Sequence, residues 1–322
     1  MKKTLLMIAV LVIASSLCFS ADKKIVVGFS QIGAENPWRT EMSENMKDTF
    51  ANAGITLKFS DAQGKQENQI KALRSFIAQK VDVIILAPVV ATGWDAVLKE
   101  IRDKHIPLIV VNRKLTVSVG NPEDYYLSFV GPDNTQAGKI AAQFVFDTFK
   151  NKPGPVNIIE LQGTVGASTA VERKLGFDQA LKSQPRFKII ASQSGDYTRA
   201  KGKEAAEAMI KTAKANGQKI DVLWSHGDDE GIGGAQALTE AGLRPGKDVV
   251  VVSVDGLRIT FEEMVAGRYN ATIENPNKYG PKCVELVKTI MAGKANTIPK
   301  NIWLEFKLYT AATAAKDLPT RH

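Results

Sequence analysis

Cysteine and histidine are scarce in this chain, which limits the chemistry that it can carry. Its 322 residues include only two cysteines and three histidines. Cys18 lies in an apolar N-terminal segment that we expect to be removed, so Cys283 would be the only remaining thiol and an internal disulfide is excluded. The histidines lack the spacing of a metal site, and we expect neither a bound metal nor another cofactor.

Long apolar runs and blocks of one charge are also missing beyond the N-terminus. No stretch after residue 21 approaches about 18 consecutive apolar residues, so we expect a soluble mature protein. The formal net charge is +8, from 42 basic and 34 acidic residues. Because the two signs are interspersed, this excess does not indicate a nucleic-acid partner.

Two glycine motifs that mark large enzyme classes are absent. The pattern G-x-G-x-x-G, which cradles the phosphates of a dinucleotide, does not follow any apolar run. The pattern G-x-S-x-G, which presents a nucleophilic serine, does not occur. A nucleotide site and a serine-hydrolase site are therefore disfavoured.

The first 21 residues read as a signal peptide. Lys2 and Lys3 form a charged start, Leu5 to Ile13 an apolar core, and small residues follow. Leu17 directly precedes Cys18, unlike the small residue of a lipid-attachment site, so we expect cleavage after Ser20 or Ala21 and an exported, periplasmic protein.

Short apolar runs alternate with amphipathic stretches along the rest of the chain, a pattern typical of a mostly parallel sheet with helices on both faces. The pattern starts afresh after the turn at residues 151–155. We therefore expect an α/β fold of two Rossmann-like, doubly wound lobes. The runs expected to be strands are Ile25–Phe29, Ile55–Phe59, Val83–Leu86, Leu108–Val111, Leu127–Val130, Val156–Ile159, Lys188–Ala191, Val222–Trp224, Val249–Val254 and Tyr269–Ile273.

The stretch from Ile25 to Thr40 carries the first candidate site. We expect a buried strand to end here and a helix to begin near Asn36-Pro37. Ligands of open α/β sheets bind at such places, outside the carboxyl ends of the strands. Glu35, Trp38 and Arg39 lie at this point. An indole and charged groups suit a polyhydroxylated neutral ligand, because the indole stacks on a sugar ring while the charges bind its hydroxyls.

Polar residues follow most of the other strands too. Asp, Asn and Ser favour turns in any case, which is the plain alternative for each single residue. His226, Asp228 and Asp229 could ligate a metal, and Asp228, Asp255 and Glu274 could form the carboxylate pair of a glycoside hydrolase. For the set as a whole, a ligand cleft between two facing sheet edges is the better account.

Several stretches then carry a family resemblance over nearly the whole mature chain. GFSQIGAENPWR, NIIELQGTVGAS, SQSGDYTRAKGKE and SVDG resemble the periplasmic sugar-binding proteins of the ribose/galactose type, which serve ABC importers. The resemblance implies two lobes joined by three crossings, near Gly131–Asn134, Glu274–Asn277 and Leu304–Lys307. It gives an N-terminal lobe of residues 22–131 plus 276–303 and a C-terminal lobe of residues 132–275 plus 304–322.

The resemblance also implies a ligand site and partners. The ligand is a monosaccharide, galactofuranose or a related aldose, and the partner is a membrane permease, with the protein itself a monomer and no enzyme. Asn112 departs from an aspartate of the family, and Asp228 from an asparagine. The residues carried over to the site are Glu35, Trp38, Arg39, Asn112, Arg113, Arg173, Tyr197, Asp228, Asp255 and Glu274.

Three other functions fit parts of this sequence pattern. A receptor for a small furanose-like signal molecule would use the same cleft. The effector domain of a transcription repressor has the same fold, but the leader and the lack of a helix-turn-helix before Ile25 contradict it. A glycoside-processing enzyme is the remaining alternative.

Overall fold

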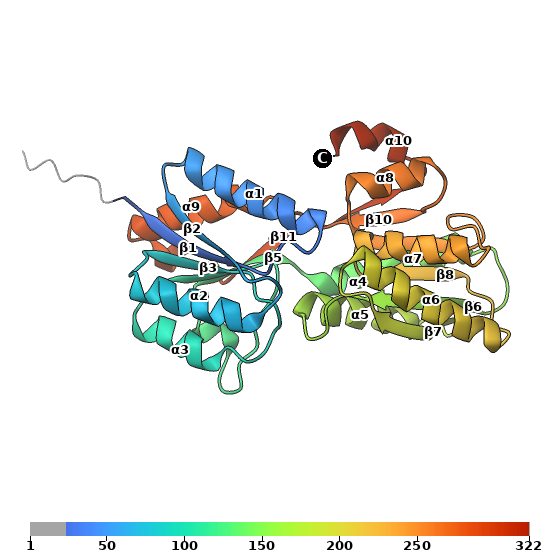
Figure 1. Ribbon diagram of the computed structural model, residues 1–322, viewed down its shortest axis with the longest axis horizontal. Helices are drawn as coiled ribbons and strands as arrows, with labels where there is room; N and C mark the ends of the chain where they lie inside the picture. The colour runs from blue at the N-terminus through green and yellow to red at the C-terminus, as the bar shows by residue number, and fades with distance from the viewer. Residues whose placement is uncertain (1–23, 322) are drawn as a thin grey trace, which may run out of the picture.

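The computed structural model describes residues 24–321, so the expected signal peptide lies outside the described residues. The chain forms two α/β lobes side by side, each built on one six-stranded sheet with helices against both faces (Figure 1). The expected fold of two doubly wound lobes is confirmed.

The sheet of the N-terminal lobe is entirely parallel, in the strand order β11-β5-β4-β3-β1-β2. Its strands are β1 (Val26–Gln31), β2 (Thr56–Asp61), β3 (Val83–Leu86), β4 (Leu108–Val111), β5 (Ser128–Pro132) and β11 (Asn301–Leu304). Its helices are α1 (Pro37–Asn52), α2 (Gln66–Ala78), α3 (Asp95–Asp103) and α9 (Gly280–Met291), with short 3₁₀ helices η1 (Pro122–Asp124) and η2 (Ala295–Thr297).

The sheet of the C-terminal lobe has the order β12-β10-β9-β8-β6-β7, and only its edge strand β12 is antiparallel to its neighbour among the described strands. Its strands are β6 (Val156–Gln162), β7 (Phe187–Ser194), β8 (Val222–Ser225), β9 (Val250–Asp255), β10 (Ala271–Glu274) and β12 (Lys307–Thr310). Its helices are α4 (Asn134–Phe149), α5 (Ser168–Leu181), α6 (Arg199–Ala215), α7 (Asp228–Glu240), α8 (Arg258–Val265) and α10 (Ala314–Asp317), with η3 (Leu318–Thr320).

The central strands follow directly from their sequences. Strands β3 and β4 read VIIL and LIVV, and every residue of both is buried, as expected for parallel strands covered on both faces. Helix α1 begins where Asn36 caps it: the Asn36 side chain accepts a hydrogen bond from the Arg39 backbone N–H, and Pro37 occupies the first helical position. This cap fixes Trp38 and Arg39 at the carboxyl edge of the sheet.

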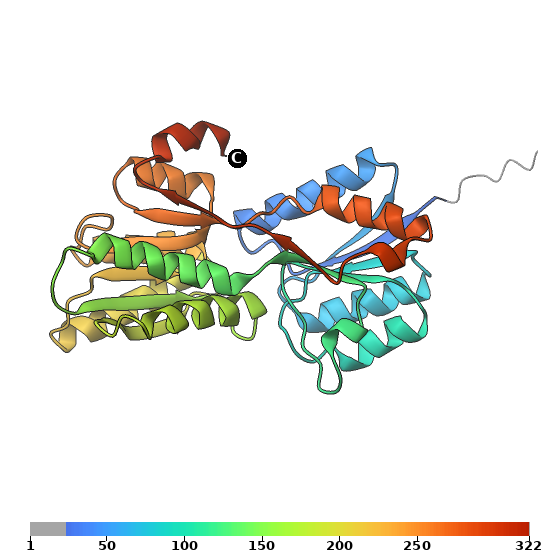
Figure 2. The same cartoon turned by 180° about the vertical axis from the view of Figure 1, so that it is seen from behind.

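Three segments cross between the lobes: β5 to α4, β10 to α9 and β11 to β12. Seen from behind in Figure 2, they run through the waist of the molecule. Strand β5 continues to Pro132 and β11 to Leu304, one residue beyond the boundaries expected at 131 and 303. The apolar run at 302–306 divides between β11 and the crossing that leads to β12.

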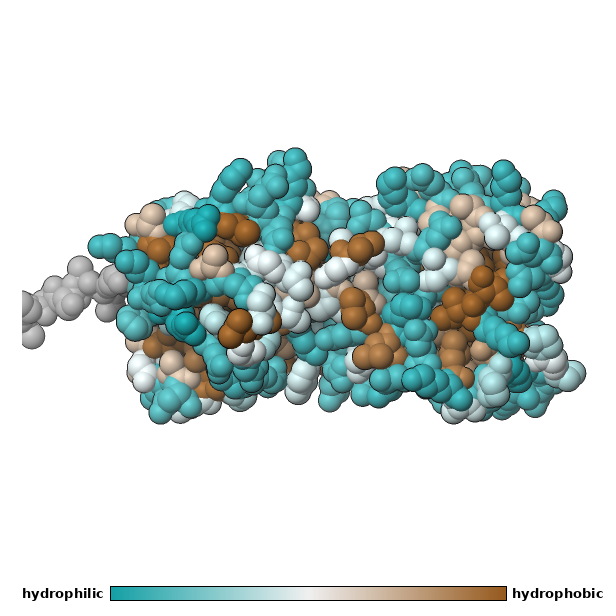
Figure 3. All heavy atoms as spheres, turned by 90° about the horizontal axis from the view of Figure 1, so that it is seen from below, coloured by the Kyte–Doolittle hydropathy of each residue, from teal (hydrophilic) through white to brown (hydrophobic). Residues whose placement is uncertain are grey.

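Hydrophilic residues cover most of the outer surface, with separate apolar areas, and the two lobes meet across the waist (Figure 3). Both lobes have their own cores on each side of the sheet. Cys283 is buried in α9, and Trp94 is fully buried in the core of the N-terminal lobe.

Candidate functional site

A narrow cavity lies where the two sheet edges face each other. Both lobes and the β10–α9 crossing contribute to its walls. Its lining residues are Asn36, Trp38, Arg39, Asn112, Arg113, Thr169, Arg173, Tyr197, Asp255 and Asn275.

Arg39 is held rigidly at the start of α1. Its Nε lies 3.2 Å from Glu35 Oε1, and its Nη2 donates to Asn112 Oδ1 at 3.1 Å. The guanidinium lies 4.8 Å from the centroid of the Trp38 ring, and the residue is only 4% exposed. A guanidinium fixed in this way presents its remaining N–H groups at a defined angle.

Two further buried arginines have no carboxylate ion pair among the described residues. Arg113 Nη1 donates to the backbone carbonyl of Val89 at 2.6 Å, while its Nε has no acceptor in the described protein. Arg173 donates to Asn134 Oδ1 at 3.1 Å and to the His226 carbonyl. Burial, with Arg39 nearby, lowers the pKa of Arg113 to about 10, so the group stays charged at neutral pH. These donors are suited to binding ligand oxygens.

Asp255 is the carboxylate that faces the arginines across the cavity. It ends β9, is 9% exposed, and accepts a hydrogen bond from Asn275 Nδ2 at 3.4 Å. Burial raises its pKa to about 7, and the nearby Asp228 adds to this, whereas Arg173 opposes it. A carboxylate on the C-terminal lobe and the Arg39 and Arg113 guanidinium groups on the N-terminal lobe can together bind hydroxyls that point both ways.

Three cavity residues have backbone conformations that non-glycine residues rarely adopt. The φ angles are +66° at Asn112, +56° at Tyr197 and +139° at Asp255. Such conformations cost of order 1–3 kcal/mol each and concentrate at functional sites. Their convergence on one cavity is independent support for this location.

Of the residues predicted for the site, seven line the cavity: Trp38, Arg39, Asn112, Arg113, Arg173, Tyr197 and Asp255. Glu35 lies just behind them, where it pairs with Arg39. Its Oε2 is buried with no partner among the described residues. Burial raises the pKa of Glu35, but the positive charges of Arg39 and Arg113 lower it, and the net result is a pKa below the usual value.

The structure keeps the other two predicted residues away from the cavity. Asp228 begins α7 and is fully buried, and its carboxylate accepts hydrogen bonds from Ser253, Thr272 and the Leu257 backbone N–H. This carboxylate therefore ties β9, β10 and the start of α8 together and leaves no oxygen for a ligand. The prediction for Asp228 is corrected on this geometry.

Glu274 is likewise occupied elsewhere. Its carboxylate pairs with Arg321 and accepts from the Tyr309 hydroxyl at 3.3 Å. The next residue, Asn275, takes the cavity position, since its side chain lines the wall and its Oδ1 is buried with no partner in the described chain. The carried-over position was thus one residue too early.

Asn36 and Thr169 also line the cavity without having been predicted. Asn36 was recognised as a helix start, and the same side chain that caps α1 donates from Nδ2 to the Tyr197 carbonyl of the other lobe at 3.2 Å. Thr169 shares a 2.9 Å hydrogen bond with the Tyr197 hydroxyl. Threonine near a helix start reads as an ordinary cap, so no sequence signal marked it.

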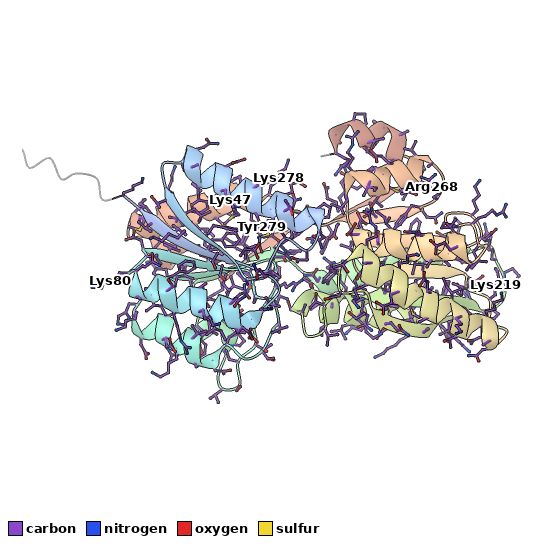
Figure 4. The ribbon with its side chains drawn as sticks, viewed as in Figure 1. Lys47, Lys80, Lys219, Arg268, Lys278 and Tyr279 are labelled. Atoms are coloured by element: carbon purple, nitrogen blue, oxygen red, sulfur yellow. The ribbon has the colours of Figure 1, made fainter. Side chains whose placement is uncertain are left out.

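A second layer of side chains packs against the residues that line the cavity. Tyr279, labelled in Figure 4, lies between α1 and the sheet of the N-terminal lobe. Its ring packs edge-on against Trp38 with centroids 6.4 Å apart, and its hydroxyl accepts from Asn112 Nδ2 at 3.4 Å. The cavity walls therefore rest on a second layer of packed side chains.

Direct bonds between the lobes close the cavity in this structure. Lys114 is the centre of one group: its backbone N–H donates to Ser168 Oγ at 2.8 Å, and its Nζ lies 2.9 Å from Glu172 Oε1. Nearby, the Ala91 N–H donates to the Gly166 carbonyl at 2.9 Å. Loops at the two facing edges thus meet once the lobes are together.

Other features of the described residues do not compete with this site. No group of three or more His, Cys, Asp or Glu within 24–321 is arranged to hold a metal ion. A larger groove of about 560 Å³ lies on the outside of the C-terminal lobe, along α6 and α7 and away from the strand ends that face the other lobe. No helix in this range has the length and apolar character needed to cross a membrane.

Comparison with known proteins identifies the family of this chain. Residues 27–295 match the family described as periplasmic binding protein domain. The galactofuranose-binding protein YtfQ of Escherichia coli (strain K12) is 44% identical over 319 residues, which cover 98% of this chain and 97% of that protein.

Two solved structures are similar over most of their length. The periplasmic binding protein of the arabinose ABC transporter from Shewanella sp. ANA-3, bound to α- and β-L-arabinofuranose, is 43% identical with a TM-score of 0.87, covering 92% of this chain and 95% of that chain. A Mycobacterium smegmatis protein in complex with β-D-fucofuranose is 40% identical with a TM-score of 0.87, covering 92% and 94%.

Proposed function

This chain belongs to the periplasmic binding protein family, and from that premise we propose that it is an exported solute-binding protein for a monosaccharide. It captures the sugar in the cavity between its lobes and delivers it to an ABC-type importer. The observation that carries this proposal is the cavity itself, in which buried arginines of both lobes face Asp255.

The chemistry of these groups supports a sugar. Hydrogen bonds that involve a charged partner contribute roughly 1.5–3 kcal/mol each, more than neutral ones. Arginines donate to ring and hydroxyl oxygens, and Asp255 accepts from hydroxyls, so adjacent hydroxyls of one ring can satisfy both. Trp38 adds an apolar face to the same wall.

We propose a furanose as the ring form, with galactofuranose or a related aldose as the ligand. The three relatives described above are named for, or bound to, galactofuranose, arabinofuranose and fucofuranose. In this wall the Asn112 amide donates to the Tyr279 hydroxyl and accepts from Arg39.

Catalysis is not part of the proposal. Hydrolysis of a glycoside needs two carboxyl groups at the sugar, and Asp255 is the only carboxylic acid lining the cavity among residues 24–321. Asp228 and Glu274, the other candidates, are engaged elsewhere. The proposed function therefore needs only capture of the sugar, closure of the lobes and release.

The partner and location follow from the same premise. We propose that the first 21 residues direct export to the periplasm, where a monomer presents its closed form to a membrane permease. The three crossings near Pro132, Asn275 and Leu304 are the hinge about which the lobes would separate to admit the sugar.

A thermal-shift and calorimetry panel tests the function. Arabinose, galactose, fucose, ribose and fructose are each compared with their methyl furanosides and methyl pyranosides, and ATP serves as the nucleotide control. A sugar at 100 times its dissociation constant should stabilise the fold by about 2.7 kcal/mol. A furanose-forming aldose should give the largest shift, and ATP none.

Two outcomes of this panel would contradict the proposal. A shift with ATP and none with any sugar would replace the sugar by a nucleotide. A uniform preference for methyl pyranosides over methyl furanosides would leave a sugar-binding protein but remove the proposed ring form.

A further inference from the structure

The ring of Tyr197 is fixed in the cavity wall by two glycines and a threonine. A Cβ atom on Gly163 would lie 1.9 Å from Tyr197 Cζ, and one on Gly227 would lie 2.9 Å from its Cδ1. The hydroxyl shares a hydrogen bond with Thr169. Only the missing side chains of these glycines leave room for this ring position.

The backbone that presents this ring is under strain. Asp196 and Tyr197 have φ angles of +53° and +56°, two successive left-handed residues that are not glycine. This conformation places Cβ close to the following carbonyl, which disfavours it for residues other than glycine. Contacts from outside the turn are needed to keep it.

Two such contacts meet at the peptide groups of Tyr197. Its backbone N–H donates to Glu230 Oε2 at 2.8 Å, within the C-terminal lobe. Its carbonyl accepts from Asn36 Nδ2 of the N-terminal lobe at 3.2 Å. Tyr197 therefore links a buried acid of α7 to the helix cap that meets it when the lobes come together.

Glu230 has no other evident purpose in the fold. It lies in the first turn of α7, is fully buried and does not line the cavity. Its Oε1 has no partner among the described residues, and burial raises its pKa well above the usual range. Burying an acid is costly, and the hydrogen bond from the Tyr197 N–H, with the Gly227 backbone nearby, offsets part of that cost.

We propose that Glu230 is a positioning residue for ligand binding, which holds the Tyr197 turn so that the ring faces the cavity and the carbonyl meets Asn36 on closure. Glu230 itself does not touch the ligand. The inference rests on the proposed sugar binding, because it explains how one wall of that site is kept in place.

A matched pair of variants separates positioning from bulk packing. Glu230→Gln keeps the size and an oxygen that accepts from the Tyr197 N–H, whereas Glu230→Met keeps the size and lacks that acceptor. Hydrogen exchange of the Tyr197 amide, followed by NMR in the ligand-free protein, reports the bond directly. We expect exchange at least about tenfold faster in Glu230→Met and within about twofold of wild type in Glu230→Gln.

Sugar affinity is the second readout, measured by calorimetry with arabinose and galactose. Glu230→Met should weaken binding at least about tenfold, and Glu230→Gln should restore it. Asn36→Ala should cost less affinity in the Glu230→Met background than in wild type, since both act through the peptide groups of Tyr197.

A third measurement covers the case in which Glu230→Met does not fold. Glu230→Asp, which keeps the acid on a side chain one methylene shorter, should show faster exchange of the Tyr197 amide than wild type, because its carboxyl no longer reaches that N–H. Asp255 and Arg173, the other charged groups that act on Glu230, are present in both proteins and serve as the internal control.

The outcomes distinguish this inference from the function beneath it. Unchanged Tyr197 exchange in folded Glu230→Met or Glu230→Asp, or failure of Glu230→Gln to restore affinity, would each overturn the positioning role. If no sugar binds wild type, the proposed function fails, and the amide exchange still decides whether Glu230 holds the turn.

Discussion

The indole N–H of Trp38 donates a 2.7 Å hydrogen bond to the backbone carbonyl of Asn275, 237 positions later in the chain. Trp38 belongs to the first helix of the N-terminal lobe, and Asn275 lies on the crossing that returns from the C-terminal lobe. Both residues also line the cavity. One side chain therefore serves the ligand wall and the hinge, whereas the sequence predicted only a stacking surface for the sugar.

Replacing Trp38 by phenylalanine should separate these roles. The variant keeps an aromatic face in the cavity but leaves the buried Asn275 carbonyl without its donor, which costs about 1–3 kcal/mol in the free energy of unfolding. Trp38→Ala should lose the stacking face as well and weaken sugar binding further. Urea unfolding and calorimetry on both variants measure the two effects. If Trp38→Phe unfolds at the same urea concentration as wild type, the bond to Asn275 contributes nothing to the fold.

The Trp38 result illustrates what a sequence can and cannot predict about this protein. Apolar runs bounded by turns predicted β3 and β4 with their observed ends, because runs of four apolar residues are too short for a helix and fit strands buried on both faces. Edge strands were less predictable: β7 continues to Ser194, since the polar residues of an edge strand can pair and still face water. The pattern of apolar residues therefore predicts which strands are buried better than it predicts how far an edge strand pairs with its neighbour.

The same limit applies to the site. Sheet topology predicts that residues after strands meet in one place, which brought Arg113 and Asp255 together on opposite walls. It does not predict which way a carboxylate points, and Asp228 turned inward to three donors of its own lobe. Glu230 gave no signal, because an acid in the first turn of a helix is an ordinary occurrence.

Removing Arg113 should weaken binding more than it weakens the fold. The side chain lies at the end of β4 and lines the cavity, so Arg113→Ala leaves ligand oxygens without a charged donor. We expect a loss of roughly 2–5 kcal/mol in binding free energy, measured by calorimetry, with the circular dichroism spectrum unchanged. Arg74→Ala, which removes an exposed pair with Glu100 in the same lobe, is the matched control and should bind as wild type does. Equal affinity in folded Arg113→Ala would mean that the ligand binds elsewhere.

The ion pair between Lys114 and Glu172 should favour the closed form. It joins the lobes at 2.9 Å and is partly exposed, with 33% and 17% of the two side chains accessible. Lys114→Ala should therefore cost at most about 1 kcal/mol of sugar affinity, and the loss should shrink at high salt. Calorimetry at two salt concentrations measures this, with Lys201→Ala, which breaks a pair inside one helix, as the control. A loss that is independent of salt, or equal in both variants, would argue against an interlobe role.

The buried carboxyl of Asp255 should make the stability of the ligand-free protein depend on pH. Its pKa is raised from 3.8 to about 7, so between about pH 4 and 7 the folded state holds a proton that the unfolded state has released. Stability then falls as the pH rises through this window, by up to about 1.4 kcal/mol per pH unit from this group, and the penalty is complete above about pH 7. Asp255→Asn should remove that slope, so its advantage over wild type should grow from pH 4 to pH 8 in urea unfolding. The exposed Asp147→Asn serves as the control. An Asp255→Asn protein whose stability runs parallel to wild type across this range would show that the carboxyl ionises as freely in the folded cavity as in the unfolded chain.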